Sequence, residues 1–316
     1  MQDNIIEQIQ RYDAQRDEAD VLDLWKKTIG QEWPIYPARF RLVLAGPEPQ
    51  HFVVREDTQV VGFAATFKSP GEPQKAGHMA ALLVAPHKRG QGIGTALHDT
   101  ALKQLGDVSS VQLGSLSPRF WCGIPGNLPS AISFFRAQGW SFSETVYDLV
   151  QDLRDYTTPA YIHQRMEREQ ISFELASSQN IADVLAFEAR EFPNWLMYYE
   201  RNARIGDYQD LLVARDNASG QVVGTLVMYS AQSHPSRPDL IWQTLLGDDA
   251  GAMGAVGVAA SERGRGIGIA LVARASELLK ERGVRNCYID WVVLTDFYAK
   301  LGYTTWRDYL TGRRLH

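Results

Sequence analysis

Two glycine-rich segments of the sequence have the composition of a phosphate-binding turn. They read RGQGIGTAL at residues 89–97 and RGRGIGIAL at residues 263–271, and each lies between an apolar strand-like run and a helix-like pattern. Because glycine carries no side chain, the backbone N–H groups that precede such a helix stay open to an anion. Neither segment has the third glycine of GxGxxG or the GK[ST] of a P-loop, so these nucleotide motifs fit less well. A tight turn without a ligand is the alternative for one copy, but recurrence in the same context favours an anion site in each half.

The two glycine segments belong to a longer repeat. Three further pairs of similar segments follow the same order along the chain: ADVLDL at 19–24 and ADVLAF at 182–187, QVVG at 59–62 and at 221–224, and FFRAQGW at 134–140 and FYAKLGY at 297–303. Four landmarks in one order predict two copies of one fold. Unequal spacing places an insertion within 115–130 of the first copy and within 228–253 of the second. Surface insertions are where duplicated domains diverge in function.

Each copy has the strand and helix patterns that would position its glycine segment. A hairpin is expected at 51–67 and at 210–229, where turn residues separate β-branched runs. A long apolar strand then enters each glycine segment, and a helix with apolar residues at helical spacing leaves it. We therefore predict an N-terminal domain at 1–157, a polar linker at 158–169 and a C-terminal domain at 170–316.

Composition excludes several classes of protein. The chain has 316 residues, which suits two domains, and its 45% hydrophobic and 22% charged content is that of an ordinary globular protein. A net charge of -5 argues against a nucleic-acid partner. Cys122 and Cys287 lack the spacing of a zinc site, so no metal is expected. The N-terminus is polar and no apolar stretch is long enough to span a bilayer, which predicts no membrane contact and a cytoplasmic location.

Both halves resemble the GNAT superfamily of acyltransferases. The family signature Q/R-x-x-G-x-G/A is matched by Arg89, Gly92 and Gly94 in the first half and by Arg263, Gly266 and Gly268 in the second half. The resemblance covers nearly the whole chain. It implies an α/β (α+β) fold of two tandem GNAT domains, each with a central mixed, mostly antiparallel sheet flanked by helices.

The resemblance also implies acetyl-CoA (CoA) as the cofactor. Its pyrophosphate would lie on the glycine segments, and its pantetheine arm would lie against main-chain groups of the preceding strands. The residues implied for the cofactor are Leu82, Val84, Arg89, Gly90, Gln91, Gly92, Ile93, Gly94 and Thr95 in the first half, and Val256, Val258, Arg263, Gly264, Arg265, Gly266, Ile267, Gly268 and Ile269 in the second half.

The two halves differ at the residue that the family commonly uses as an acid. GNAT chemistry is the direct attack of a neutral amine on the thioester, after which the departing thiolate takes a proton. The place of the family's tyrosine is taken by Tyr298 in DFYAKLGY, whereas Phe135 in SFFRAQGW cannot donate a proton. We therefore expect catalysis in residues 170–316 and a first domain that binds cofactor or supports the fold, as in tandem GNAT proteins whose C-terminal domain is active.

Several carboxylates of the second half are candidates for the general base. Asp290, at the end of an expected strand, is the first choice, and Asp248, Asp249 and Glu191 are alternatives that would accept a proton or bind an ammonium group. The segment 191–208 is dense in aromatic residues. It indicates an aromatic-lined pocket for a compact amine or a sugar ring, and core packing is the alternative interpretation. The residues expected to contact the substrate are Glu191, Phe192, Trp195, Asp249 and Trp291.

These residues together predict an acetyl-CoA-dependent N-acetyltransferase for a small primary amine. An amino sugar, an aminoglycoside-like compound and a polyamine all fit that description. A non-catalytic acyl-CoA-binding sensor and a protein or peptide N-acetyltransferase are the alternatives. The sequence is compatible with a monomer, in which the two domains form a pseudo-dimer, and with a homodimer.

Overall fold

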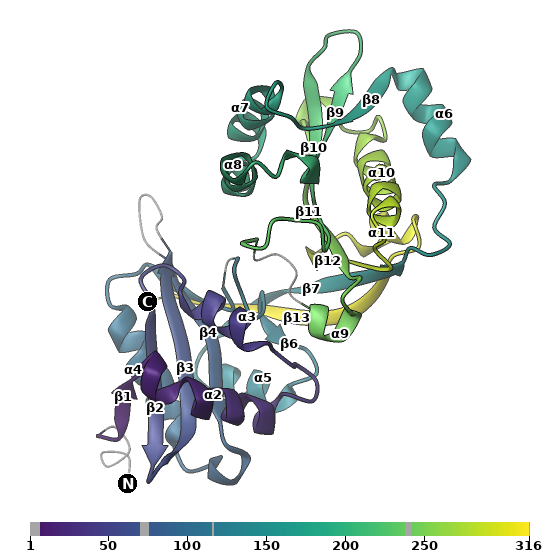
Figure 1. Cartoon of the computed structure of the whole chain (residues 1–316). Helices are drawn as coiled ribbons and strands as arrows, with labels where there is room; N and C mark the ends of the chain where they lie inside the picture. Colours follow the sequence, from purple (N-terminus) through teal and green to yellow (C-terminus); the bar gives the residue numbers. More distant parts are fainter. Residues whose placement is uncertain (1–6, 70–75, 116, 238–241, 316) are drawn as a thin grey trace. The chain divides into compact units, whose positions relative to one another are not determined.

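The computed structural model describes residues 7–69, 76–115, 117–237 and 242–315 (Figure 1). The chain forms two compact units. Unit 1 contains residues 1–146 and 307–316, and unit 2 contains residues 147–306. The C-terminal segment of the chain therefore belongs with the N-terminal half.

Unit 1 has a sheet in the order β1-β2-β3-β4-β5, which β13 and β6 extend. Its elements in chain order are β1 (Ile9–Arg11), α2 (Ala14–Thr28), α3 (Pro37–Leu44), β2 (Gln50–Glu56), β3 (Gln59–Ser69), β4 (Ala76–Val84), η1 (Pro86–Lys88), α4 (Ile93–Leu105), β5 (Ser110–Leu113), β6 (Ile124–Pro125) and α5 (Pro129–Ala137). The β4–β5 pairing is parallel, and the other described pairings of this unit are antiparallel.

Unit 2 has a sheet in the order β7-β12-β11-β10-β9-β8. The elements that follow α5 are β7 (Ser141–Asp152), α6 (Ala160–Glu169), β8 (Ile171–Leu175), α7 (Ile181–Glu191), α8 (Leu196–Ile205), η2 (Tyr208–Asp210), β9 (Leu211–Asp216), β10 (Val222–Tyr229), α9 (Gln243–Leu246), β11 (Gly251–Val258), η3 (Ala260–Glu262), α10 (Ile267–Glu281), β12 (Asn286–Val292), α11 (Thr295–Ala299) and β13 (Thr304–Leu315). Here the β11–β12 pairing is parallel and the other described pairings are antiparallel. The two units confirm the predicted fold class.

The repeated QVVG segments end at a glycine because a helix crosses the sheet there. In unit 1, a Cβ atom on Gly62 would lie 2.8 Å from Cδ1 of Leu97 on α4. In unit 2, a Cβ atom on Gly224 would lie 3.0 Å from Cδ1 of Leu271 on α10. Interiors are close-packed, so a larger residue would push away the helix that follows each glycine loop. Both units therefore need a glycine at this position.

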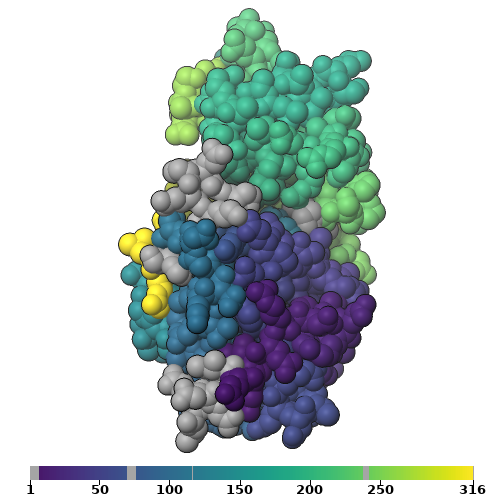
Figure 2. Space-filling model, turned by 90° about the vertical axis from the view of Figure 1, so that its left-hand side faces the viewer, coloured from purple at the N-terminus to yellow at the C-terminus, as the bar shows by residue number. Residues whose placement is uncertain are grey.

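Helices cover both faces of the sheet in unit 2. Successive side chains of a strand point to opposite faces. Gly224 of β10 faces α10, whereas its neighbour Thr225 donates a hydrogen bond to Glu188 of α7. Figure 1 shows α7 and α8 on one side of β9, β10 and β11, with α10 on the other side. Figure 2 views the α7–α8 side, where the teal residues of these helices form the surface of unit 2.

Each unit closes its sheet with a strand from the other half of the sequence. In unit 1, β5 pairs with residues 313–315 of β13. In unit 2, β12 pairs with residues 147–152 of β7. The compact units therefore differ from the expected boundaries at 157 and 170. Repeated motifs mark where each copy begins, but they carry no signal for which copy the last strand joins.

The expected linker at 158–169 contains the helix α6, which packs on unit 2. Ile162 and Met166 lie four residues apart on one face of α6 and are buried in the hydrophobic core of this unit, together with Leu271 and Leu279 of α10. The other residues of α6 are mostly polar or charged. That composition suggested a linker, although the apolar pair is enough to seat a short helix.

Candidate active site

In unit 2, strands β11 and β12 separate part-way along their length. Their parallel ladder covers residues 251–253 of β11 and 287–289 of β12. Two residues beyond the last pair, Ala255 and Trp291 have positive φ angles of 47° and 53°. The pairing of β11 with β10 and of β12 with β7 shifts register at this level, so each strand leaves the other at a bulge. Left-handed non-glycine residues are concentrated at functional sites.

Beyond the separation, alternate residues of β11 turn their main-chain polar groups to the open side. The amide of Ala259 bonds to β10, and Gly257 pairs with β10 as well. Neighbouring residues of a strand direct their N–H and C=O groups to opposite edges. Val256 and Val258 therefore direct theirs away from β10, into the opening. These are the two residues of this strand that the sequence predicts for the pantetheine arm.

Unit 1 has the same kind of opening. Strand β4 pairs with β5 through residues 76–79, and the amide of Ala85 bonds back to β3. By the same alternation, Leu82 and Val84 direct their main-chain groups to the open side. Here Nε of Arg89 donates a hydrogen bond to the Val84 carbonyl oxygen at 3.1 Å. A side chain of the first glycine loop thus occupies one of the groups predicted for the pantetheine arm.

Both glycine loops have the backbone conformation that favours glycine. The φ angles are 75° and 90° at Gly90 and Gly92, and 88° and 85° at Gly264 and Gly266. Gly92 and Gly266 are the N-cap residues of α4 and α10, and neither helix has a side-chain cap. No side chain therefore takes up the first N–H groups of these two helices, which is compatible with the predicted anion site.

Arginine side chains from two elements lie at the second loop. Arg265 forms ion pairs with three carboxylates. These carboxylates, Glu169 most strongly, raise the pKa of the Arg265 guanidinium group above its usual value. Arg165 of α6 donates a hydrogen bond to the carbonyl oxygen of Gly264, and a Cβ atom on Gly266 would lie 2.8 Å from its Nε atom. Arg265 is thus engaged within the protein, whereas Arg165 brings a positive charge to the N-terminus of α10.

The remaining loop residues use their side chains for packing or local hydrogen bonds. Ile93 and Ile267 are buried, and Ile269 packs against the core of unit 2. Gln91 donates a hydrogen bond to the main-chain carbonyl oxygen of His87 in η1, and Thr95 accepts one from Gln138. For the isoleucines, the main chain is therefore the part that a ligand would contact.

Tyr298 and Asp290 lie within electrostatic reach of each other. Tyr298 is half-buried on α11, and Asp290 lies at the bulge of β12. Burial, and next the negative charge of Asp290, raises the pKa of Tyr298 to about 12. The hydroxyl group is therefore protonated at neutral pH, as a proton donor must be. The corresponding Phe135 of unit 1 is buried against the rings of Phe134 and Trp140.

The expected aromatic residues of the α7–α8 connection lie against β11. The ring of Phe192 covers Gly257, where a Cβ atom would lie 2.5 Å from its Cε2 atom. Phe192 also stacks on Trp195, with ring centroids 5.0 Å apart. The structure thus brings Phe192, with Trp195 stacked on it, to the strand that carries the open edge, and the close approach of Phe192 requires a glycine at 257.

Glu191 and Asp249 lie at opposite ends of β11. Glu191 accepts a hydrogen bond from the amide of Ala260, just after the strand, at 3.5 Å. The hydrogen bond from Arg190 and, more weakly, the charge of Arg263 lower the pKa of Glu191. Asp249 precedes the strand. Glu191 is therefore at the end next to the glycine loop, and Asp249, with Asp248, is at the end away from it.

A buried carboxyl group that sequence reasoning missed lies beneath the β11 bulge. Glu188 of α7 is 0% exposed and accepts a hydrogen bond from Thr225. Burial raises its pKa to about 7. Tyr199 of α8 donates a hydrogen bond to the carbonyl oxygen of the bulged residue Ala255 at 2.8 Å. These groups support the bulge from the α7–α8 side. The sequence signal for Glu188 is an acidic residue within the apolar stripe of α7 that contains Val184.

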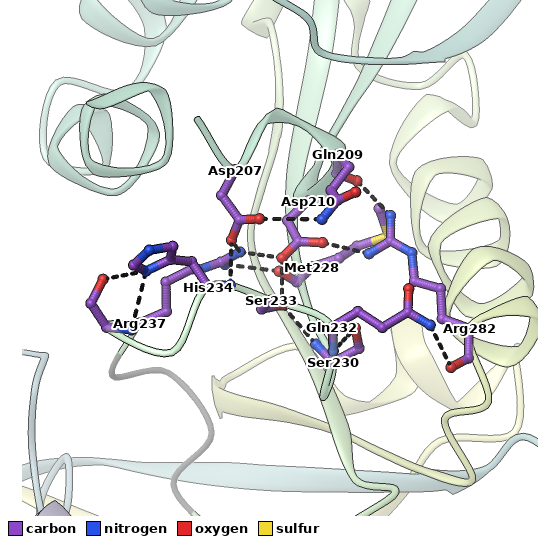
Figure 3. A network of polar contacts seen from close by, with 11 residues as sticks. Asp207, Gln209, Asp210, Met228, Ser230, Gln232, Ser233, His234, Arg237 and Arg282 are labelled. Carbon is purple, nitrogen blue, oxygen red and sulfur yellow. Dashed lines mark hydrogen bonds and ion pairs between the residues drawn. The ribbon is translucent and has the colours of Figure 1, made fainter. Parts of the chain in front are cut away.

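An ion-pair network lies at the C-terminal end of α10, and the insertion of the second copy contributes Arg237 to it. Figure 3 shows side chains from η2, from the segment after β10 and from the end of α10 converging. Arg237, whose side chain is 1% exposed, pairs with Asp207 and Asp210, and Arg282 pairs with Asp210. Arg237 also lies over the ring of Tyr229. Because α10 begins at the glycine loop, this network is remote from the loop, and its charges satisfy one another.

Replacing Arg237 by methionine is expected to lower the free energy of unfolding of unit 2 by about 3 kcal/mol. Removing Arg237 takes its cation from the buried carboxylate of Asp207 and leaves Asp210 to pair with Arg282 alone. Urea denaturation measures the loss. Arg274→Met is the matched control, because Arg274 is partly exposed and its pairs with Glu277 and Glu281 on the helix surface are worth less than about 1 kcal/mol. Equal losses in the two variants would contradict a stabilising role for the network.

Neither metal-binding nor membrane-spanning features are found in the described parts of the chain. Within residues 7–69, 76–115, 117–237 and 242–315, no three His, Cys, Asp or Glu side chains gather in a way that could hold a metal ion. Over the same ranges, each helix is too short or too polar to cross a membrane.

Two family models match the chain. One, described as the Acetyltransferase (GNAT) family, matches residues 18–140, and the other, described as an Acetyltransferase (GNAT) domain, matches residues 207–305. The chain contains two GNAT domains in tandem. Each matched range includes one glycine loop and the strand that leads into it, so the GNAT assignment rests on the elements that form the two openings.

Solved structures share the fold of this tandem GNAT protein. A solved chain, described as a fungal multi-domain GH3 beta-N-acetylglucosaminidase in which a GCN5-related glucosamine N-acetyltransferase region exists, is 40% identical to this chain, with a TM-score of 0.92. The match covers 97% of this chain and 38% of that chain. A GCN5-related N-acetyltransferase from Sphaerobacter thermophilus and a tandem GNAT protein from the clavulanic acid biosynthesis pathway are each 18% identical, with TM-scores of 0.65. Each of these two matches covers 97% of this chain. They cover 95% and 98% of the matched chains, respectively, and at 18% identity they show the fold alone. A search of curated proteins found no match.

Proposed function

We propose that this tandem GNAT protein transfers an acetyl group from acetyl-CoA to the primary amine of an amino sugar, with the chemistry in unit 2. The observation that carries the proposal is the opening between β11 and β12. It places an open main-chain edge between the glycine loop and the bulge where Asp290 lies near Tyr298. The 40% identity to a glucosamine N-acetyltransferase region supports an amino sugar as the acceptor.

The chemistry of several residues of unit 2 supports acetyl-CoA as the cofactor. The N-terminus of α10 and the guanidinium group of Arg165 would hold the pyrophosphate, since both are donors with positive charge. The main-chain groups of Val256 and Val258 would bond to the amides of the pantetheine arm, as a neighbouring strand would. A Cβ atom at Gly266 would displace the Arg165 side chain, which lies 2.8 Å from that position. Acetyl-CoA, when bound, supplies the activated thioester.

Two side chains of unit 2 then handle protons. Asp290 accepts a proton from the substrate ammonium group, directly or through water, and frees the nitrogen lone pair to attack the thioester carbonyl. The Tyr298 hydroxyl would give its proton to the thiolate sulfur that leaves. The proton taken up by Asp290 and the second proton of the new amide nitrogen would both pass to solvent, from which the tyrosinate would be reprotonated. The products are an N-acetylated amine and CoA.

For unit 1 we assign cofactor binding without catalysis. Its glycine loop and its β4–β5 opening match those of unit 2. However, Phe135 carries no proton to donate, and Arg89 occupies the carbonyl oxygen of Val84. A non-catalytic acyl-CoA-binding role is therefore the second candidate function, and Phe135 favours it for unit 1. The contact of Arg89 with Val84 would have to open for the pantetheine arm to bind there as in unit 2.

Release of free thiol from acetyl-CoA with a panel of amines tests the proposed function. The panel contains glucosamine, an aminoglycoside, spermidine and a lysine peptide. N-acetylglucosamine, whose amine is already acylated, is the matched control. We expect the highest kcat/KM with glucosamine. Best activity with a polyamine or a peptide would overturn the substrate class. Release with none of the amines, combined with acetyl-CoA binding by calorimetry, would instead support the acyl-CoA-binding role.

A further inference from the structure

Asp148 lies on β7, the strand that pairs with β12 at the bulge of the candidate active site. It belongs to the part of β7 that is in unit 2. The register of β7 against β12 shifts between Ile289 and Val292, so Asp290 and Trp291 lie together opposite Asp148. Although Asp148 precedes the second GNAT repeat in sequence, it therefore lies beside the residue predicted as the base of that repeat.

The buried carboxylate of Asp148 accepts hydrogen bonds from two tryptophans of unit 2. Its residue is 2% exposed. One oxygen accepts from the indole Nε1 of Trp242 at 3.0 Å. The other oxygen accepts from the main-chain N–H of Trp291 at 3.4 Å. The first contact anchors the carboxylate, and the second reaches the backbone of the bulge itself.

The backbone of Trp291 needs such support. Its φ angle of 53° lies in the left-handed region, which is strained for a non-glycine residue. Residues of this kind persist where their surroundings fix them. The same conformation leaves the Trp291 residue 37% exposed, next to Asp290. The exposed indole of Trp291 offers a surface on which a sugar ring can stack, and the neighbouring carboxylate of Asp290 can pair with the ammonium group of an amino sugar.

We propose that Asp148 is a positioning residue for acyl transfer in unit 2. It fixes the left-handed bulge and thereby directs Asp290 and the indole of Trp291 towards the amine substrate. This inference rests on the proposed function, because it needs the amine to bind at the bulge. It also makes a strand of the first half, β7, a required part of the second GNAT site.

Steady-state kinetics of the full chain with glucosamine and acetyl-CoA test the role of Asp148. Asp148→Asn keeps the shape of the side chain but leaves one oxygen for two donors, and Asp148→Ala removes both acceptors. We expect kcat/KM for the amine to fall about tenfold in D148N and further in D148A, since small misplacements of reacting groups carry such losses. The KM for acetyl-CoA should stay within about twofold, because its predicted contacts lie on other elements.

Asp152→Asn is the matched control. Asp152 is on the same strand, but its carboxylate is exposed and pairs with Arg154. This variant should keep wild-type kinetics. Amine kcat/KM that is equal in D148N and wild type would overturn the proposal. So would a loss in D148N that affects the KM of acetyl-CoA and of the amine equally, because that is the result of general unfolding.

A double-mutant cycle with Trp291→Gly separates positioning from simple packing. Glycine adopts the left-handed conformation without strain, so the bulge in W291G no longer needs Asp148 to hold it. We expect D148A to lower the amine kcat/KM less in the W291G background than in wild type, a non-additivity typical of coupled residues. The same loss in both backgrounds would overturn the proposed coupling.

Hydrogen exchange keeps the inference distinct from the proposed function. Peptides covering residues 287–296 should exchange faster in D148A than in wild type, and those covering 211–229 should not change. This measurement needs no turnover. Faster exchange in a protein that acetylates no amine would contradict the proposed function and leave the geometric part of the inference intact. Unchanged exchange at 287–296 would overturn the inference itself.

Discussion

Removal of residues 307–316 is expected to destabilise unit 1 by at least about 5 kcal/mol, while unit 2 keeps its fold. These residues pair with β5 and β6 of unit 1. They also place the buried ring of Tyr309 against Trp33, with centroids 5.9 Å apart. Truncating one large buried aromatic residue already costs about 3–5 kcal/mol. The removal of a strand adds its hydrogen bonds to that loss.

Peptide-resolved hydrogen exchange on the shortened chain measures this effect. Protection should fall in β4 and β5 and persist in β9 and β10. In the full chain, Tyr309→Ala should reproduce part of the loss. Leu315→Ala is the matched control, because Leu315 is an exposed residue of the same strand. Normal protection of β5 in the shortened chain would contradict the assignment of β13 to unit 1.

Replacing Tyr298 by phenylalanine is expected to lower kcat about 100-fold while acetyl-CoA still binds. The variant keeps the ring and loses the proton donor, and proton transfer by a positioned side chain contributes about 10²–10⁴-fold. Burial and the charge of Asp290 raise the pKa of the wild-type hydroxyl to about 12. A raised pKa keeps the proton in place as the pH rises, so Tyr298 should not limit activity between about pH 7 and pH 10.

The Tyr298→Phe prediction is checked by steady-state kinetics and by calorimetry with acetyl-CoA. Phe135→Tyr is a matched partner, because it restores a hydroxyl group to the corresponding position of unit 1. The double variant should be as slow as Tyr298→Phe alone if unit 2 carries the chemistry. Wild-type turnover in Tyr298→Phe would remove this residue from the mechanism.

The features that local sequence patterns encode were predictable. Glycines at Gly92 and Gly266 signal a left-handed turn before a helix, and the structure has both turns. The repeated QVVG segments predicted two copies of one fold, and the close approach of α4 and α10 explains their glycines Gly62 and Gly224. Periodicity and glycine chemistry act over a few residues, so a single sequence is enough to show them.

The features that depend on distant partners were not predictable. Asp148 is an ordinary strand aspartate in sequence, and it gains a function only because β7 pairs with β12. Arg165 lies in a segment whose composition suggested a linker, and its contact with Gly264 depends on how α6 docks. The bulges at Ala255 and Trp291 have no glycine at the left-handed position, so the sequence carries no signal for them. Such positions follow from strand pairing and packing, which no local pattern specifies.

Because the last strand of unit 1 comes from the C-terminal end of the chain, unit 1 cannot complete its fold until the whole chain has been synthesised. Residues 1–146 leave the ribosome first, but the edge of β5 stays unpaired until residues 313–315 have been made. An exposed strand edge promotes aggregation, and multidomain chains are most exposed to it during synthesis. An N-terminal fragment expressed alone would keep that edge permanently. The two GNAT repeats are therefore separate in sequence, but neither reaches its final fold without the translation of both.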